Sequence, residues 1–167
     1  MAVLAKGGVS LRRAIDRRWP GRDKASDGWI GDSAHAARPS DHNPKHGIVH
    51  AIDIDADLDR RDPGAAQRLV DELVAYAKSG QKGSGRVKYV IFRGRIYSGT
   101  LRRLWWVARK YTGANQHFSH IHVSFTCKAD ADGSAWPLPI LKVPAKKAVS
   151  PKKGTSVKKA TSPRKAK

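Results

Sequence analysis

Polar and apolar residues alternate most regularly in the C-terminal third of the chain, from His120 to Phe125. His120, His122 and Ser124 occupy the polar positions, and a single apolar residue follows each of them. Successive side chains of a β-strand point to opposite faces. The pattern therefore predicts a strand with one apolar face for the core and one polar face that carries two imidazoles side by side.

Three other stretches also have the pattern of strands. In residues 50–56, isoleucines alternate with Asp53 and Asp55, which predicts a strand with a core side and an acidic side. Residues 87–92 and 96–98 are rich in β-branched and aromatic residues and flank an Arg-Gly-Arg sequence. This arrangement is typical of a β-hairpin.

Helical periodicity predicts two helices. The longer one has apolar residues at i, i+3, i+4 and i+7 spacing; Asp62 is its N-cap, Pro63 its first residue, and Gly80 follows its end. Its apolar stripe is suited to cover a sheet. A shorter helix is expected from an N-cap at Ser10 to Trp19, where Pro-Gly stops it.

Two long segments lack such periodicity. Residues 22–50 are dense in Gly, Asp, Ser, Asn, Pro and His, and a loop of this length inside a domain is usually functional. Residues 142–167 contain nine Lys and one Arg but no acid, and Ala, Val, Ser, Thr and Pro fill the spaces between them. Such a segment cannot bury a core, so we expect a disordered basic tail after a single domain of residues 1–141.

The aromatic and basic segment 101–111 contains Trp105 and Trp106 and predicts either a further strand or the wall of a cleft. Core packing is the plainer role for the two tryptophans. The single cysteine, Cys127, excludes an intrachain disulfide and a thiolate zinc cluster. We expect it to be a small buried apolar residue.

The net charge of +19 points to a polyanionic partner, which could be nucleic acid, an anionic membrane or an acidic cell-wall polymer. Paired lysines of the tail are the expected contacts: Lys146, Lys147, Lys152, Lys153, Lys158 and Lys159. The N-terminal apolar run is too short for a signal peptide, and no stretch approaches a membrane span of roughly 18 apolar residues. We therefore expect a protein made in the cytoplasm without a signal peptide. We also expect it to be a monomer.

The two polar strand faces carry the ligand types of a catalytic zinc site. Such a site has three protein ligands of His, Asp or Glu and leaves a fourth position open to water. Asp53 lies on one strand, His120 and His122 lie on the other, and His42 precedes the first strand in the loop. Two histidines on one polar strand face are unusual for packing alone, so we predict a metal site.

The same residues resemble the three motif segments of the zinc D-Ala-D-Ala carboxypeptidase family, which is grouped with lysostaphin-type peptidases and the hedgehog signalling domain. Among its members, the chain looks most like phage endolysins that cleave peptidoglycan stem peptides. The segments are Ser40-Asp41-His42, Ala51-Ile52-Asp53-Ile54 and His120-Ile121-His122-Val123. The resemblance implies an α+β fold, with a small antiparallel sheet that holds zinc on its open face and is covered by helices on the other.

Carried over onto these motifs, the resemblance makes His42, Asp53 and His122 the zinc ligands. His120 then stands at the position of the general base or transition-state stabiliser. Many members of the carboxypeptidase branch use a Glu there, but the only Glu of this chain lies on the predicted covering helix. His117 could hydrogen-bond the substrate carbonyl or the tetrahedral intermediate.

Several other residues have two interpretations. Arg38 could pair with a substrate carboxylate or polarise a carbonyl, or it could simply tether the loop. Ser40 is expected to support a metal ligand. His46 and His50 compete with His42 as ligands, because His42 and Asp53 are eleven positions apart, a longer spacing than in many members of the family. Strand alternation places His50 on the face opposite Asp53, and His46 lacks the Ser-x-His context.

The expected function is zinc-dependent hydrolysis of peptide bonds in peptidoglycan, by an endopeptidase or a D,D-carboxypeptidase that reaches the bacterial wall after phage-type release. Two alternatives remain at this point. The tail resembles those of linker histones, which favours a nucleic-acid-binding protein. The hedgehog branch offers a zinc module of the same fold without catalytic activity.

Overall fold

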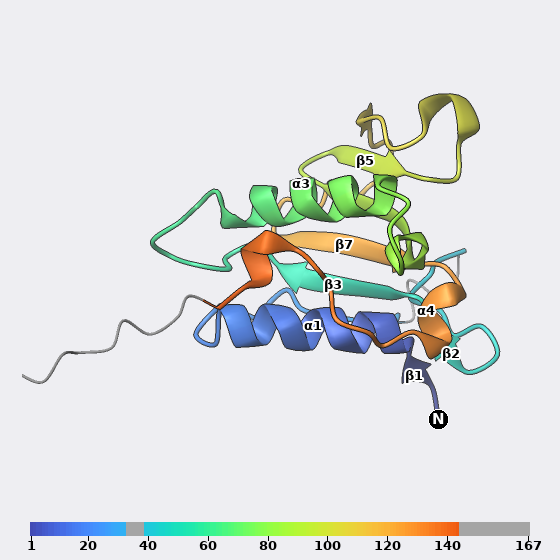
Figure 1. Cartoon of the computed structure of the whole chain (residues 1–167), viewed down its shortest axis with the longest axis horizontal. Coiled ribbons are helices and arrows are strands. Elements are labelled where there is room, and N and C mark those ends of the chain that lie inside the picture. The colour runs from blue at the N-terminus through green and yellow to red at the C-terminus, as the bar shows by residue number, and fades with distance from the viewer. Residues whose placement is uncertain (33–38, 144–167) are drawn as a thin grey trace, which may run out of the picture.

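The computed structural model describes residues 1–32 and 39–143 and shows an α+β fold built on a small antiparallel sheet (Figure 1). Its five strands lie in the order β3-β7-β4-β5-β6, and every neighbouring pair is antiparallel. The strands are β3 (Ala51–Asp55), β4 (Val87–Phe92), β5 (Arg95–Ser98), β6 (Arg109–Lys110) and β7 (His120–Phe125). A separate parallel pair is formed by β1 (Val3–Leu4) and β2 (Ile48–Val49).

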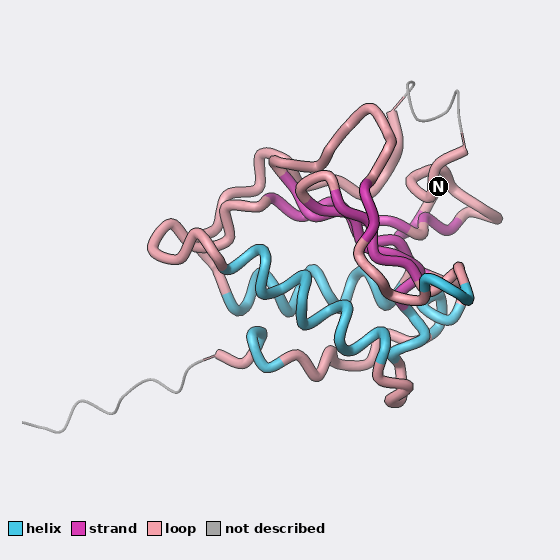
Figure 2. Tube along the Cα trace, turned by 90° about the horizontal axis from the view of Figure 1, so that it is seen from above, coloured by secondary structure: helices cyan, strands magenta, loops and turns pink. Residues whose placement is uncertain are grey.

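Helices cover one face of the sheet, whereas loops lie over the other face (Figure 2). The helices of the described residues are α1 (Lys6–Arg18), α3 (Ala65–Lys78) and α4 (Lys128–Ala131), with short 3₁₀ turns η1 (Ser84–Arg86), η2 (Arg102–Leu104) and η3 (Pro139–Leu141). Among these residues, no helix combines the length and apolar composition that a membrane span requires.

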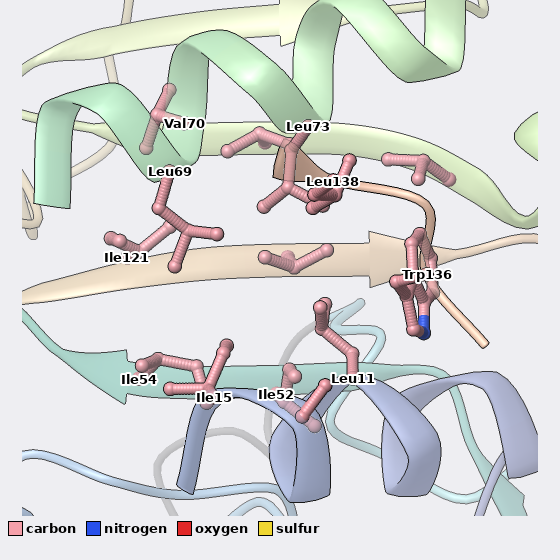
Figure 3. Close-up of a cluster of buried hydrophobic side chains, with 14 of the residues drawn as sticks. Leu11, Ile15, Ile52, Ile54, Leu69, Val70, Leu73, Ile121, Trp136 and Leu138 are labelled. Atoms are coloured by element: carbon pink, nitrogen blue, oxygen red, sulfur yellow. The ribbon is translucent and has the colours of Figure 1, made fainter. Parts of the chain in front are cut away.

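The core lies between the covered face of the sheet and the helices α1 and α3 (Figure 3). Strand alternation directs the isoleucines of β3 and β7 toward the helices, which meet them with the apolar sides of their own turns. The fully buried members include Leu11, Ile15, Ile52, Ile54, Leu69, Leu73 and Ile121. The predicted strands 50–56 and 120–125 are confirmed with their predicted inward and outward faces.

Truncation of one core side chain gives a direct test of this packing. Leu73 is fully buried on α3, so we expect Leu73→Ala to lower the free energy of unfolding by about 2–5 kcal/mol. Leu101→Ala is the matched control, since this leucine is exposed and its truncation should change stability by no more than about 0.5 kcal/mol. Chemical denaturation measures both. Equal effects would contradict the placement of α3.

The two helix starts differ from the predictions. Helix α1 begins at Lys6 after Ala5, so Ser10 is not its N-cap but an internal residue whose hydroxyl donates to the carbonyl of Gly7. Gly7, in the first turn, is a poor helix former, so the sequence does not suggest that the helix begins here. It permits close packing, because a Cβ at Gly7 would lie 2.9 Å from Cβ of Ala129. Helix α3 begins two residues after the predicted Pro63 and ends as predicted before Gly80.

The predicted hairpin is confirmed as β4 and β5, joined at Arg93 and Gly94. In the segment that follows, Trp106 is buried in the core, whereas Trp105 is 45% exposed. Neither tryptophan is among the residues that line the cleft described below. The expectation for Cys127 was wrong: this residue precedes α4 and is exposed.

The chain after α4 returns across the helical layer. Arg86 is fully buried and stacks on Trp136 at 4.0 Å, and its Nη1 donates to the carbonyl of Ser134 at 2.8 Å. Leu141 is buried in the core at the end of this segment. The tail lysines predicted to bind polyanions, from Lys146 onward, lie outside the described residues.

Candidate metal centre

The register of β3 and β7 brings a carboxylate and an imidazole together on the open face of the sheet. Asp53 and His122 are directly opposite each other, and Asp55 is opposite His120. Oδ1 of Asp53 lies 2.9 Å from Nδ1 of His122. Cross-strand neighbours on one face have closely spaced Cβ atoms, so these two donors need no unusual backbone to converge.

The loop before β2 adds a third donor at the same point. Nε2 of His42 lies 3.2 Å from Oδ2 of Asp53 and 3.2 Å from Nδ1 of His122. One ligand atom from each of the three residues lies within 4.8 Å of the others. The His42–Asp53–His122 group could therefore hold a metal ion, and the three sequence-predicted ligands are the three that meet.

Each histidine of this group is oriented through its second ring nitrogen. Nδ1 of His42 lies 3.2 Å from the carbonyl oxygen of Trp29, which can only accept, so Nδ1 is the donor there and Nε2 is the ring nitrogen that faces Asp53. Nε2 of His122 lies 3.1 Å from the hydroxyl of Ser124. Ligating histidines in proteins are held in this way by a partner on the other nitrogen. Two imidazoles and one carboxylate also match the donors of three-ligand zinc sites.

The charges in the group favour a cation. Burial works to raise the pKa of Asp53, but hydrogen bonds from His122 and His42 outweigh it and hold the pKa of the carboxyl well below its usual range. Burial likewise works to lower the pKa of His42, and the Asp53 carboxylate overrides it and raises that pKa. A proton on His42 therefore competes with a metal for the same carboxylate, so metal binding should release protons and weaken as the solution becomes more acidic.

The structure separates His42 from its two competitors. His46 is exposed in the turn before β2, where its φ is +51° and Gly47 follows. His50 is buried on the opposite side of β3, as its position in the alternation predicts, and its Nε2 lies 2.7 Å from Asp130 of α4. Neither belongs to the metal-binding group.

His117 and His120 stand beside the group without joining it. The ring centres of His117 and His120 are 4.8 Å apart, and His117 lies 5.4 Å from His122. Nε2 of His120 is 3.8 Å from Oδ1 of Asp53. Burial, together with the neighbouring histidines, lowers the pKa of His117 to about 4, and burial is also the largest cause of the lowered pKa of His120. Both rings are therefore neutral near pH 7.

These side chains line a cleft of about 440 Å³ over the open face of the sheet. Two tyrosines form aromatic walls of this cleft: Tyr111 belongs to the segment 101–111 that the sequence predicts as a strand or a cleft wall, whereas Tyr89 was not predicted. Tyr89 of β4 stacks on His122 with ring centres 5.5 Å apart, and Tyr111 meets the edge of His117 at 5.3 Å. Tyr89 alternates with the buried Val90, a signal that could have placed it on the open face. The pairing of β4 with β7, which brings Tyr89 next to His122, could not be inferred from that pattern.

The role of Asp41, which is buried within the Ser40-Asp41-His42 segment, was also not predicted from the sequence. Nζ of Lys88 lies 2.7 Å from one carboxylate oxygen of Asp41, and Nζ of Lys45 lies 3.1 Å from the other. Burial works to raise the pKa of Asp41, but hydrogen bonds from both lysines lower it to about 2. The ionised carboxylate anchors the loop that carries His42 through its pairs with the two lysines. The backbone carbonyl of Asp41 also accepts a hydrogen bond from the N–H of His50, which fixes the same loop.

Of the remaining predicted residues, Arg38 lies outside the described residues. Ser40 lines the cleft, and its hydroxyl accepts a hydrogen bond from the backbone N–H of His42 at 3.2 Å. Asp55 is a structural carboxylate, because its oxygens accept from the backbone N–H groups of Ser26 and Asp57.

Loss of the Ser40 hydroxyl should loosen the loop at His42, one of the three residues that could hold a metal ion. We expect Ser40→Ala to weaken zinc affinity about 10-fold, within the roughly 10–100-fold range for partners that orient ligands. Competition with a chromophoric chelator measures the affinity. Ser79→Ala, at the end of α3, removes a hydroxyl that bonds only locally and should leave it unchanged. Equal zinc affinities for the two variants would show that Ser40 plays no part in positioning His42.

Comparison with models of known protein families, with curated proteins and with solved structures gives no match for this chain.

Proposed function

We propose that the protein is a zinc-dependent peptidase that hydrolyses peptide bonds of bacterial peptidoglycan. One observation carries the proposal: a group of two imidazoles and one carboxylate lies in an open cleft, and two further histidines stand beside it. A purely structural zinc site is closed by a fourth protein ligand, whereas a catalytic site keeps that position open. The substrate class rests on the resemblance of the three motif segments, and the basic composition agrees with it.

The chain supplies the ligands His42, Asp53 and His122, and a zinc ion bound by them would polarise a carbonyl and acidify a water molecule. His120 is the nearest base outside the ligand set. As a neutral imidazole it has one acceptor nitrogen, so it can take a proton from water and return it to the leaving amine. The hydroxyl of Ser119, 3.1 Å from Nδ1 of His120, holds this ring in place.

We assign to His117 a hydrogen bond to the oxygen on which negative charge develops. Its Nδ1 is buried and has no hydrogen-bond partner among the described residues. Its backbone has a φ of +56°, and the peptide is held by hydrogen bonds from His117 N–H to the Asn115 side chain and from Arg93 N–H to its carbonyl. A donor fixed in this way need not reorganise during reaction, which is how such groups stabilise a transition state.

Two measurements test the proposal together. The purified protein should contain one zinc ion per chain by elemental analysis, and incubation with purified peptidoglycan should release fragments with new peptide termini, identified by mass spectrometry. Removal of the metal with a chelator should stop the release, and added zinc should restore it. Stoichiometric zinc without new termini would favour the non-catalytic zinc module, and absence of zinc would refute the site.

A second role, binding of polyanions, is favoured by nine Lys and Arg in residues 144–167. Deletion of these residues should weaken retention on peptidoglycan or nucleic acid. The affinity should also decrease less steeply with salt concentration, because fewer counterions are released on binding. Hydrolysis of a soluble stem peptide should remain unchanged. Circular dichroism of the truncated chain is the control, and loss of its folded signal would contradict a domain that ends near Leu141.

A further inference from the structure

The loop between β5 and β6 presents large apolar side chains to solvent. We call residues 99–108 the Trp105 loop. In Figure 1 it projects beyond β5, at the edge of the molecule farthest from α1. Four of its side chains are between 42% and 49% exposed: Leu101, Leu104, Trp105 and Val107. Single exposed apolar residues are ordinary on a protein surface, whereas four within seven positions need an explanation.

The loop is held in this conformation by the tryptophan that points inward. Trp106 is buried, its backbone N–H donates to the carbonyl of Ser98 at 2.8 Å, and its φ is +55°. Its indole lies so close to Gly99 that a Cβ there would be only 3.0 Å from the ring. A left-handed backbone at a bulky residue is unfavourable, so the packing of Trp106 must maintain it. As a result, the adjacent Trp105 is turned outward.

Cationic groups surround these apolar side chains. Residues 73–129 contain eleven Lys and Arg and neither Asp nor Glu. Arg102 and Arg103 lie between Leu101 and Leu104 and are exposed, as are Arg95 and Lys110 on the neighbouring strands. Within the described part of the chain, no carboxylate lies within ion-pair distance of Arg102 or Arg103. The loop therefore combines an exposed apolar surface with uncompensated positive charge.

Charge complementarity limits what can cover this surface. The basic tail carries only positive charge, and a second copy that docked through the same loop would present the same arginines, so both are repelled. Nucleic acids and anionic glycan polymers satisfy the arginines, but they offer no apolar environment for Leu101, Leu104 and Val107. An anionic bilayer satisfies both requirements, since its headgroups attract arginine and its acyl boundary accepts leucine and tryptophan.

We propose that the Trp105 loop inserts into the interface of an anionic lipid bilayer. Leu101, Leu104 and Trp105 enter the boundary between headgroups and acyl chains, and Arg102 and Arg103 contact lipid phosphates. The loop lies apart from the metal cleft and shares none of its lining residues. Membrane attachment thus goes beyond the proposed peptidase and does not depend on it.

Quenching of tryptophan fluorescence tests the insertion in the full-length chain. The probes are vesicles of phosphatidylglycerol and phosphatidylcholine with brominated acyl chains, compared with pure phosphatidylcholine vesicles. Trp105 is the most exposed of the five tryptophans, and the basic tail contains none. We expect quenching by the anionic vesicles and loss of most of it in Trp105→Phe. Vesicle binding without quenching would mean attachment through the tail and would overturn the proposal.

Paired variants assign the affinity to the loop by co-sedimentation with the same vesicles. Leu104→Ser with Trp105→Ser should weaken binding roughly tenfold or more, whereas Ile30→Ser, at a residue that is 55% exposed elsewhere, should not. Arg102→Gln with Arg103→Gln should also weaken it roughly tenfold or more, unlike Arg60→Gln with Arg61→Gln. If the loop variants instead lose affinity for single-stranded DNA and keep vesicle binding, the surface recognises nucleic acid and the proposal is wrong.

Discussion

Replacement of His42 by alanine is expected to abolish stoichiometric zinc binding, whereas His46→Ala should leave it intact. The two histidines belong to the same loop, but only His42 directs a ring nitrogen at Asp53 and His122. Loss of a direct ligand should weaken zinc affinity by more than the roughly 100-fold upper range found when an orienting partner is lost. Elemental analysis after dialysis against a weak chelator measures the zinc content.

A thermal melt provides an independent readout of the same pair. A ligand that binds only the folded chain at 1,000 times its dissociation constant stabilises that chain by about 4 kcal/mol. Zinc should therefore raise the melting temperature of the wild type and of His46→Ala, but not that of His42→Ala. The metal-free melting temperatures of the two variants control for damage to the fold. A zinc shift that disappears in His46→Ala and persists in His42→Ala would reverse the assignment.

The alternation of residues along the chain was sufficient to predict the faces of both site strands. Asp53 points to the open face because the isoleucines on either side of it are buried. His50 is three positions before Asp53, so strand alternation places it on the opposite face of the sheet. The sequence pattern does not predict which residues lie opposite each other. The pairing of Asp53 with His122 joins residues that are 69 positions apart, and it depends on the whole antiparallel order of the sheet.

Close packing explains what the sequence pattern concealed. Helix α1 includes Gly7 in its first turn, where the missing side chain allows close approach to α4, although glycine is a poor helix former when judged by propensity alone. The sequence also does not indicate that Asp41 is more than a polar loop residue. Its partner Lys88 lies on a strand that is distant in the sequence. The ligand types of the site were therefore predictable from local patterns, whereas the residues that hold them in place were not.

Replacement of His120 is expected to stop hydrolysis without removing zinc. His120 lies on the same strand face as His122, but its Nε2 is 3.8 Å from Asp53, and it is not one of the three residues whose ligand atoms converge. Loss of general acid–base catalysis should lower the rate of peptidoglycan hydrolysis by roughly 10²–10⁴-fold in His120→Ala. Zinc content should stay at that of the wild type, and His46→Ala serves as the control for activity.

A second substitution distinguishes the two roles open to His120. The amide of glutamine can donate a hydrogen bond to an oxyanion, but it cannot accept and return a proton near neutral pH. If His120 is the general base, His120→Gln should be as inactive as His120→Ala, and the low-pH limb of the kcat/KM profile should change in both variants. If His120 only stabilises the transition state, glutamine should recover part of the activity. Wild-type rates in both variants, measured with zinc bound, would remove His120 from the mechanism and leave His117 as the nearest remaining imidazole outside the ligand set.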